Sequence, residues 1–153
     1  MTNPSPPSPI PSSLIIYCDG ASRGNPGPAA AAFVAVNQDD QVIHQQGKFL
    51  NITTNNVAEY QAVILALEWL IEQSNNRTIE QCVINLDSEL LYKQIIGKYK
   101  IKAPHLKPLM VQIHQLLARL KDQKLDIKFQ HQLRSHNHLA DSLANHTLDQ
   151  QAS

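Results

Sequence analysis

The sequence predicts a single α/β domain, in which helices cover the faces of a mixed β-sheet. Three extended segments precede the first helix, and short apolar strands then alternate with helices toward the C-terminus. A meander followed by helix-alternating strands is typical of a sheet with both antiparallel and parallel pairs. A chain of 153 residues, 42% of them hydrophobic, is long enough for one domain with a real core and too short for two comfortable ones.

Three strands and one long helix are expected in the first half of the chain. The strands cover Leu14–Asp19, Pro28–Asn37 and Gln41–Leu50, and a hairpin-like connection at residues 38–40 joins the last two. Val57–Glu72 is expected to be helical, because apolar residues recur there at near-helical spacing and Ala, Leu and Glu are abundant.

Helices and short strands are expected to alternate in the second half. Glycine readily ends a helix, so Gly97 is the expected stop of the first of these helices. The resulting order is β-β-β-α-β-α-α-β-α, which gives five strands in one sheet. The expected elements are a strand at Gln81–Leu86, a helix at Ser88–Gly97, a helix from Pro104 or His105 to about Asp122, a strand at Leu125–Leu133 and a helix at Leu139–Leu148.

The first twelve residues differ in composition from the rest. Residues 1–12 hold five prolines and three serines and are expected to form a disordered tail before a domain at 13–149. They contain neither a basic region nor an apolar core, so no secretory signal is expected. The longest apolar run, Ala29–Val36, is far too short to cross a bilayer. A cytoplasmic location is therefore expected.

The two cysteines and the single tryptophan are expected in the core. Cys18 and Cys82 lie inside apolar runs and lack metal-ligand spacing, which favours small buried residues. Trp69 is expected to be a core residue of its helix rather than a stacking platform for nucleic-acid bases.

Charge is distributed unevenly although the formal net charge is zero. Ten of the thirteen Lys and Arg residues lie between Lys93 and Arg134, where only two acids occur. This asymmetry suggests one positive face and one negative site. An ordinary helix with solvated lysines remains an equal alternative on this evidence.

Four acidic residues occupy positions that composition does not explain. Asp19 ends the first expected strand, Asp87 follows the fourth, and Glu59 and Asp141 lie in the first turns of the first and last long helices. Sites in α/β sheets collect at the carboxyl ends of strands and at neighbouring helix starts. If the first and fourth strands are parallel neighbours, Asp19 and Asp87 lie side by side, about 5 Å apart.

Carboxylates at this distance repel each other unless a cation lies between them. Hard divalent ions such as Mg²⁺ take carboxylate oxygens and keep several waters. A group of acids without His or Cys partners favours such an ion over zinc.

Each acid also has a purely structural interpretation. Asp19 before Gly20 can be an ordinary turn signal. Glu59 can form a capping box with Asn56, Asp141 can complement the helix dipole, and Asp87 can cap the helix that follows it. These four interpretations are independent of one another, whereas a metal site explains all four positions together.

Each of the four acids lies in a short motif, and the four motifs follow one another in a fixed order. They are DGASRGNPGP at 19–28, TTNNVAEYQA at 53–62, DSEL at 87–90 and NHLADSLA at 137–144. With these motifs the chain resembles the type 1 ribonuclease H family over about residues 13–149. The family has the element order expected above, so the resemblance implies the ribonuclease H-like fold.

The resemblance implies an endonuclease that hydrolyses the RNA strand of RNA–DNA hybrids with two Mg²⁺ ions, for which Mn²⁺ substitutes, leaving 5′-phosphate and 3′-hydroxyl ends. Asp19 would bridge both ions. Asp141 would help to hold the ion that activates water, and Glu59 and Asp87 the ion that stabilises the leaving oxygen. Paired ions about 4 Å apart suit this chemistry, because they clamp both oxygens of an in-line phosphoryl displacement. A monomer without a membrane partner is expected.

Substrate contacts are implied for uncharged residues of the first two motifs. Asparagine supplies a donor and an acceptor to base edges and to the 2′-hydroxyl that distinguishes RNA from DNA. Glu89 departs from the family pattern, because many relatives have Gln there and an acid is less suited to a nucleic-acid backbone. The residues carried over are Ser22, Asn25, Thr54, Asn55 and Asn56.

The segment before the last helix is shorter than in family members with a mobile histidine there. The chain is more similar to compact relatives with an arginine seven residues before the final acid, which is Arg134 here. Arg134 is the expected auxiliary residue, holding a phosphate or helping the leaving group. His136 is the alternative, and His131 is expected to be a structural residue in mid-strand.

The large basic handle of some relatives is also missing. The short stretch 96–104 carries Lys98, Lys100 and Lys102, which are placed to meet DNA phosphates. Two further functions stay open: the same fold with broadened cleavage that includes double-stranded RNA, and a non-catalytic hybrid-binding module. Loss of one acid is the expected mark of the latter, and none is lost.

Overall fold

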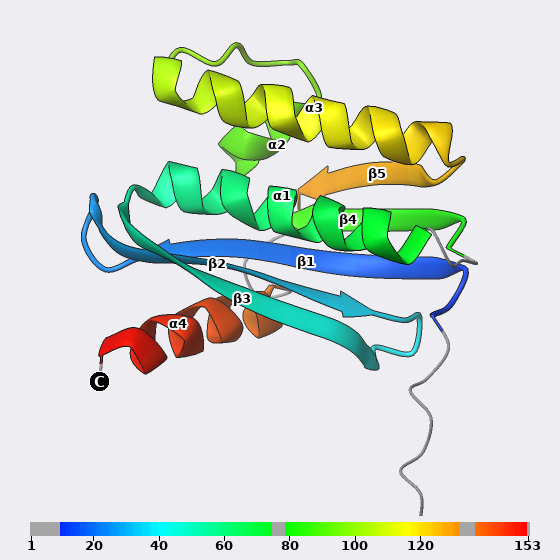
Figure 1. The fold of residues 1–153 in the computed structure, drawn as a ribbon, viewed down its shortest axis with the longest axis horizontal. Helices are drawn as coiled ribbons and strands as arrows, with labels where there is room; N and C mark the ends of the chain where they lie inside the picture. Colours follow the sequence, from blue (N-terminus) through cyan, green and yellow to red (C-terminus); the bar gives the residue numbers. More distant parts are fainter. Residues whose placement is uncertain (1–9, 75–78, 132–136, 153) are drawn as a thin grey trace, which may run out of the picture.

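The computed structural model describes residues 10–74, 79–131 and 137–152, which form one five-stranded sheet with helices on both faces (Figure 1). Residues 1–9 of the expected tail lie outside the described residues. The elements are β1 (Ser13–Ser22), β2 (Gly27–Val36), β3 (Val42–Thr53), α1 (Asn55–Ser74), β4 (Gln81–Leu86), α2 (Glu89–Ile95), the 3-10 turn η1 (Pro104–Leu106), α3 (Lys107–Asp122), β5 (Asp126–His131) and α4 (His138–Ala152).

The sheet is mixed, as the sequence predicts. Its strand order is β3-β2-β1-β4-β5. β1 pairs antiparallel with β2 and parallel with β4, and β4 in turn pairs parallel with β5. β1 is the middle strand of the sheet, so its parallel pairing with β4 ends near the middle of one end of the sheet.

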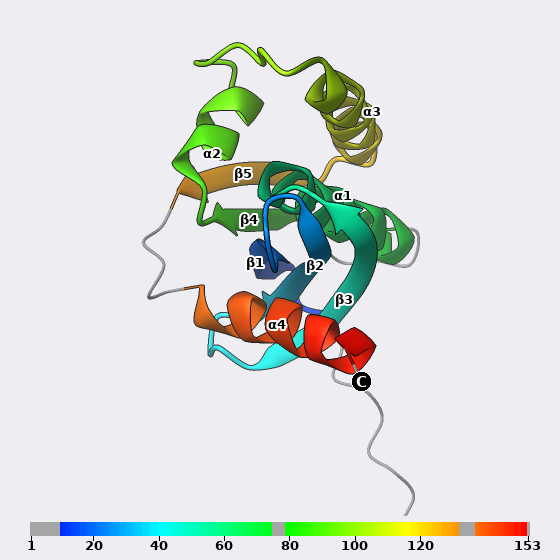
Figure 2. The same cartoon turned by 90° about the vertical axis from the view of Figure 1, so that its left-hand side faces the viewer.

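Helices cover the two faces unequally. α1 packs on β1 and β2 with α3 beside it, whereas α4 packs on the opposite face against β1, β2 and β3 (Figures 1 and 2). α4 comes close to β3 because Gly47 has no side chain: a Cβ there would lie 2.2 Å from Thr147 Oγ1.

The sequence located every element, and β4 has the expected bounds. The main correction concerns β1, which continues three residues beyond Asp19, so Asp19 lies inside the strand rather than at its end. The reason is its second neighbour: pairing with β4 stops at Cys18, but pairing with β2 continues to Ser22 opposite Ala29. The expected residues 132 and 133 of the last strand lie outside the described residues.

The predicted core residues are buried. Cys18 and Cys82 are each 1% exposed and carry free thiols, and Trp69 is 6% exposed. Gly97 has φ +85° just beyond α2, as expected for a residue that ends a helix. No helix in the described ranges has the length and apolar content needed to cross a bilayer.

Candidate active site

The ends of the parallel pair β1–β4 place two predicted acids on adjacent strands. Cys18 and Leu86 are the last residues paired in this ladder, so Asp19 and Asp87 are the next residue on each strand. The expectation that the first and fourth strands are parallel neighbours is therefore confirmed. Asp19 is only 1% exposed, and its Oδ1 accepts a hydrogen bond of 3.0 Å from the Gly20 amide.

A glycine brings the third acid to the same place. A Cβ on Gly20 would lie 2.3 Å from the carbonyl carbon of Ala58 and 2.4 Å from the amide nitrogen of Glu59. Only glycine permits the backbones of β1 and α1 to approach this closely. The contact fixes Glu59 beside the strand that carries Asp19.

The Cys18 thiol is buried, and its Sγ lies 3.7 Å from the Ala62 carbonyl oxygen of α1. Burial is the main reason why the pKa of this thiol is well above its usual value, and Cys82, Glu59 and Asp19 raise it further.

The fourth acid is positioned by two asparagines. The buried Asn137 donates from Nδ2 to the Cys18 carbonyl at 2.9 Å, which ties the start of α4 to β1 beside Asp19. Asp141 follows one turn later, in the first turn of α4 as expected, and its amide donates to the Asn137 carbonyl at 3.1 Å. Asn145 Nδ2 then donates to the Asp141 carbonyl at 3.0 Å and lies 3.5 Å from its Oδ1.

A polar cavity of about 400 Å³ opens between these elements. It unites two of the predicted acids with three of the predicted substrate residues. Its lining consists of Gly20, Ala21, Ser22, Asn55, Asn56, Glu59, Ser88, Asp141 and Asn145.

Two polar side chains of this lining, those of Asn145 and Ser88, were not among the predicted site residues. Asn145 stands four residues after Asp141, so helical periodicity places both side chains on one face and was the available signal. Ser88 enters because it follows Asp87 directly.

Three of the predicted substrate residues form hydrogen bonds with the nearby backbone. Asn25 Oδ1 accepts from the Asn55 amide at 3.1 Å, which satisfies a donor at the start of α1. Thr54 Oγ1 accepts from the Val57 amide at 3.2 Å. The Ser22 hydroxyl donates to the Gly24 carbonyl inside the β1–β2 turn. Asn25 and Thr54 thus hold the segment that presents Asn55 and Asn56.

Two of the purely structural interpretations of the acids are wrong. Ser88, not Asp87, caps α2, since its hydroxyl accepts from the Leu91 amide. α1 begins at Asn55 with Thr54 as its cap, so Glu59 is the fifth helical residue and forms no capping box. Only Asp141 lies in a first turn, where it also complements the dipole of α4.

The chemistry of these donors fits a hard divalent cation, because they are carboxylate and amide oxygens. Among residues 10–74, 79–131 and 137–152, however, no three His, Cys, Asp or Glu side chains converge as a ready-made ion site. The four acids share one end of the sheet, and their roles as metal ligands stay predictions.

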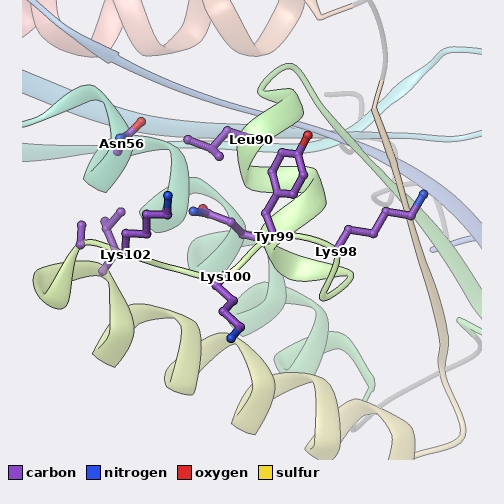
Figure 3. Close-up of a pocket in the computed structure, with 9 residues that line it drawn as sticks. Asn56, Leu90, Lys98, Tyr99, Lys100 and Lys102 are labelled. Atoms are coloured by element: carbon purple, nitrogen blue, oxygen red, sulfur yellow. The ribbon is translucent and has the colours of Figure 1, made fainter.

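A second and larger cavity, of about 610 Å³, lies beside α2 (Figure 3). The α2–α3 connection supplies the predicted lysines Lys98, Lys100 and Lys102, while Asn56 and Leu90 come from the two helices opposite. Asn56 also lines the acidic cavity, so the two cavities share a wall. The positive region predicted from the sequence therefore adjoins the negative one.

The structure describes only one of the three residues considered for or against an auxiliary role. Arg134 and His136 lie outside the described residues. His131 is the last described residue of β5; it is exposed, and its Nε2 lies 3.2 Å from the Asp87 carbonyl oxygen. Since a carbonyl only accepts, this nitrogen is the donor.

Comparison with known proteins agrees with the fold and the motifs. The family model described as "Reverse transcriptase-like" matches residues 17–147. The ribonuclease HI of Halobacterium salinarum is 38% identical over 133 residues, 87% of this chain and 63% of that protein. A bifunctional protein of Mycobacterium tuberculosis is 33% identical over 137 residues, 89% of this chain and 35% of that protein. The chain thus spans less than two thirds of these relatives.

A solved structure matches over its whole length. The crystal structure of LC11-RNase H1 in complex with an RNA/DNA hybrid superposes with a TM-score of 0.83 at 36% identity, and the match covers 92% of this chain and 99% of that one. The sheet order and the helices on its faces are those of the ribonuclease H-like fold. The chain belongs to the type 1 ribonuclease H family.

Proposed function

We propose that this chain is a divalent-metal-dependent endonuclease that hydrolyses the RNA strand of RNA–DNA hybrids. The observation that carries the proposal is the cavity that Glu59 and Asp141 line together with Asn55 and Asn56, at the end of the β1–β4 ladder that Asp19 and Asp87 directly follow. Family membership and the hybrid-bound relative LC11-RNase H1 support the same substrate.

Asp19, Glu59, Asp87 and Asp141 would hold the ions, which are Mg²⁺ in this proposal, with Mn²⁺ as a substitute. Two such ions supply an activated water and neutralise the charge that develops on the scissile phosphate. The protein contributes rigidity: Gly20 fixes Glu59 against β1, and Asn137 and Asn145 fix Asp141. The products would carry 5′-phosphate and 3′-hydroxyl ends.

Uncharged residues would recognise the RNA strand. Ser22, Asn55 and Asn56 line the acidic cavity with hydroxyl and amide groups, which bind 2′-hydroxyls without adding charge. Asn25 and Thr54 support this recognition by holding the start of α1.

The lysine-lined cavity would hold the backbone of the DNA strand. Lys98, Lys100 and Lys102 surround a space that shares Asn56 with the acidic cavity, so one duplex can reach both. Positive charge there favours phosphate without reading sequence.

Arg134 would act beside the acids as an auxiliary residue, binding a phosphate or assisting the leaving group, with His136 as the alternative. Replacing Arg134 with alanine should then lower turnover much more than hybrid binding. The proposal also includes a monomeric protein in the cytoplasm.

Labelled RNA–DNA hybrid, double-stranded RNA, single-stranded RNA and double-stranded DNA, each incubated with Mg²⁺ or Mn²⁺, test this proposal. We expect cleavage of the RNA strand of the hybrid, with 5′-phosphate ends on the products. Equal cleavage of double-stranded RNA would instead show broadened specificity. Binding of hybrid without cleavage in either metal would indicate a non-catalytic binding module.

A further inference from the structure

A buried polar pair links a residue of the second motif, on α1, to a residue of α2 that lies in none of the four motifs. Tyr60 and Gln94 are only 2% and 8% exposed, and the Tyr60 hydroxyl donates to Gln94 Oε1. Since the amide oxygen of Gln94 only accepts, the Tyr60 hydroxyl is the donor in this hydrogen bond. The pair satisfies two groups that would each be costly to bury alone.

This hydrogen bond orients the rest of the Gln94 amide. A primary amide carries its oxygen and its NH₂ group on opposite arms of one carbon. With the oxygen bound to Tyr60 inside the protein, the NH₂ group is directed away from Tyr60. Gln94 also lines the lysine cavity, so the side of this residue that faces away from Tyr60 belongs to the cavity wall.

Gln94 differs in kind from the other polar groups of this cavity. A lysine is a point charge on a flexible stem and attracts a phosphate without fixing its position. The lysines that line the cavity include the exposed Lys98, Lys100 and Lys102. Gln94 is held from behind by a buried partner, so its N–H groups have one direction.

We infer that Gln94, oriented by Tyr60, is a specificity-determining residue that donates to a phosphate oxygen of the nucleic-acid backbone and fixes which phosphate occupies the cavity. The inference rests on the proposed function, because it takes the cavity as the place of the DNA strand. The lysines attract the phosphates electrostatically, and Gln94 determines how the duplex is positioned along its axis relative to the acids.

The substitution Gln94→Glu separates the two contacts of this side chain. Glutamate has nearly the same shape and keeps an oxygen for Tyr60, but it presents an oxygen instead of NH₂ to the cavity. We expect the KM for hybrid to rise about tenfold, as for loss of a hydrogen bond to a charged group, with kcat within about threefold of wild type. Fluorescence anisotropy in an Asp87→Asn background, where the hybrid is not cleaved, should show the same loss of affinity.

Tyr60→Phe is the second variant and removes only the hydroxyl. It should raise KM by about threefold to tenfold with little change in kcat, because Gln94 loses its orientation. This variant decides the question if the glutamate variant does not fold. The cleavage positions along a long hybrid should also spread in both variants, an effect that loss of stability alone would not produce.

The outcomes separate the inference from the function it rests on. If the wild-type protein neither binds nor cleaves hybrid, both fail. If it binds and cleaves hybrid while Gln94→Glu and Tyr60→Phe keep the wild-type KM, affinity and cleavage positions, the inference alone is wrong. It is equally wrong if both variants lose kcat and keep KM.

Discussion

The acidic end of the sheet and the lysine cavity are built in opposite ways. Backbone contacts fix the acidic end: Gly20 packs directly on α1, and the buried Asn137 binds the Cys18 carbonyl. Exposed side chains supply the charge of the lysine cavity: Lys98, Lys100 and Lys102 line it, and Lys93, outside the lining, donates to the Tyr99 hydroxyl at 3.2 Å. In the proposed function, the chemistry that needs exact positions lies on rigid elements, and the attraction of the nucleic-acid backbone comes from exposed lysines.

Asp87→Asn should break the acidic end with the largest effect on activity. Loss of one carboxylate from the proposed metal site should reduce hybrid cleavage by at least about 100-fold, comparable to removing a key group that stabilises a transition state. Folding should survive, because removal of a negative charge next to Asp19 relieves repulsion. Single-turnover cleavage and thermal unfolding measure the two effects.

Asp126→Asn is the matched control for this prediction, since Asp126 is an exposed acid at the start of β5. It should cleave hybrid like wild type. An Asp87→Asn protein that kept more than a tenth of wild-type turnover would contradict the assigned role.

Gly20→Ala should disturb the acidic end through packing. A Cβ 2.3 Å from the Ala58 carbonyl carbon forces α1 away from β1, and such overpacking costs about 1–3 kcal/mol or more of unfolding free energy. Activity should fall as well, because Glu59 moves with the backbone. Denaturant unfolding and hybrid cleavage measure both.

Gly97→Ala provides the comparison, because Gly97 has a positive φ but open space around it. It should cost about 1 kcal/mol through backbone strain alone and leave kcat unchanged. If both variants lost the same stability and kept full activity, the close approach at Gly20 would not position Glu59.

The sequence predicted the acidic end well because its signals are local. Acids next to strand ends and helix starts, in four ordered motifs, defined the site before the topology was known. It misplaced Asp19 at a strand end, because the three further residues of β1 depend on β2, a partner that periodicity does not reveal. It also misjudged Glu59, because Thr54 rather than Asn56 caps α1.

The lysine cavity was predictable only in part. The lysine-rich stretch was visible, but the cavity depends on contacts between distant segments, such as Tyr60 with Gln94. Tyr60 follows Glu59 in a motif and Gln94 lies in none, so no local pattern joins them. Tertiary pairs of this kind have no sequence period.

Replacing Lys98, Lys100 and Lys102 together with alanine should weaken hybrid binding at the lysine cavity and leave catalysis at the acidic end of the sheet unchanged. Each lost phosphate contact should reduce the slope of log affinity against log salt by about 0.7–0.9. Hybrid binding should weaken at least about tenfold at low salt, while kcat at saturating hybrid changes little. A triple variant of Lys48, Lys107 and Lys121 is the control with the same change in net charge. Equal losses in the two triple variants would mean that only net charge matters.

Glu89→Gln should have the smallest effect, although it restores the residue that many relatives carry. The hydrogen bond from Lys93 and, next, the charge of Lys93 lower the pKa of Glu89, so this carboxylate stays ionised. The positive charge of Lys93 compensates its negative charge, which would otherwise repel the nucleic-acid backbone. Hybrid affinity should therefore rise by less than about threefold, as expected for an exposed and screened pair.

Because the pKa of Glu89 is lowered in the folded state, the pair stabilises the fold above the usual glutamate pKa and loses this effect as the pH falls through the folded value. The difference in melting temperature between wild type and variant should accordingly shrink from pH 7 to pH 3. Lys93→Met, which leaves Glu89 without its cation, should weaken hybrid binding instead; a large gain in affinity from Glu89→Gln would show that Lys93 does not neutralise the acid.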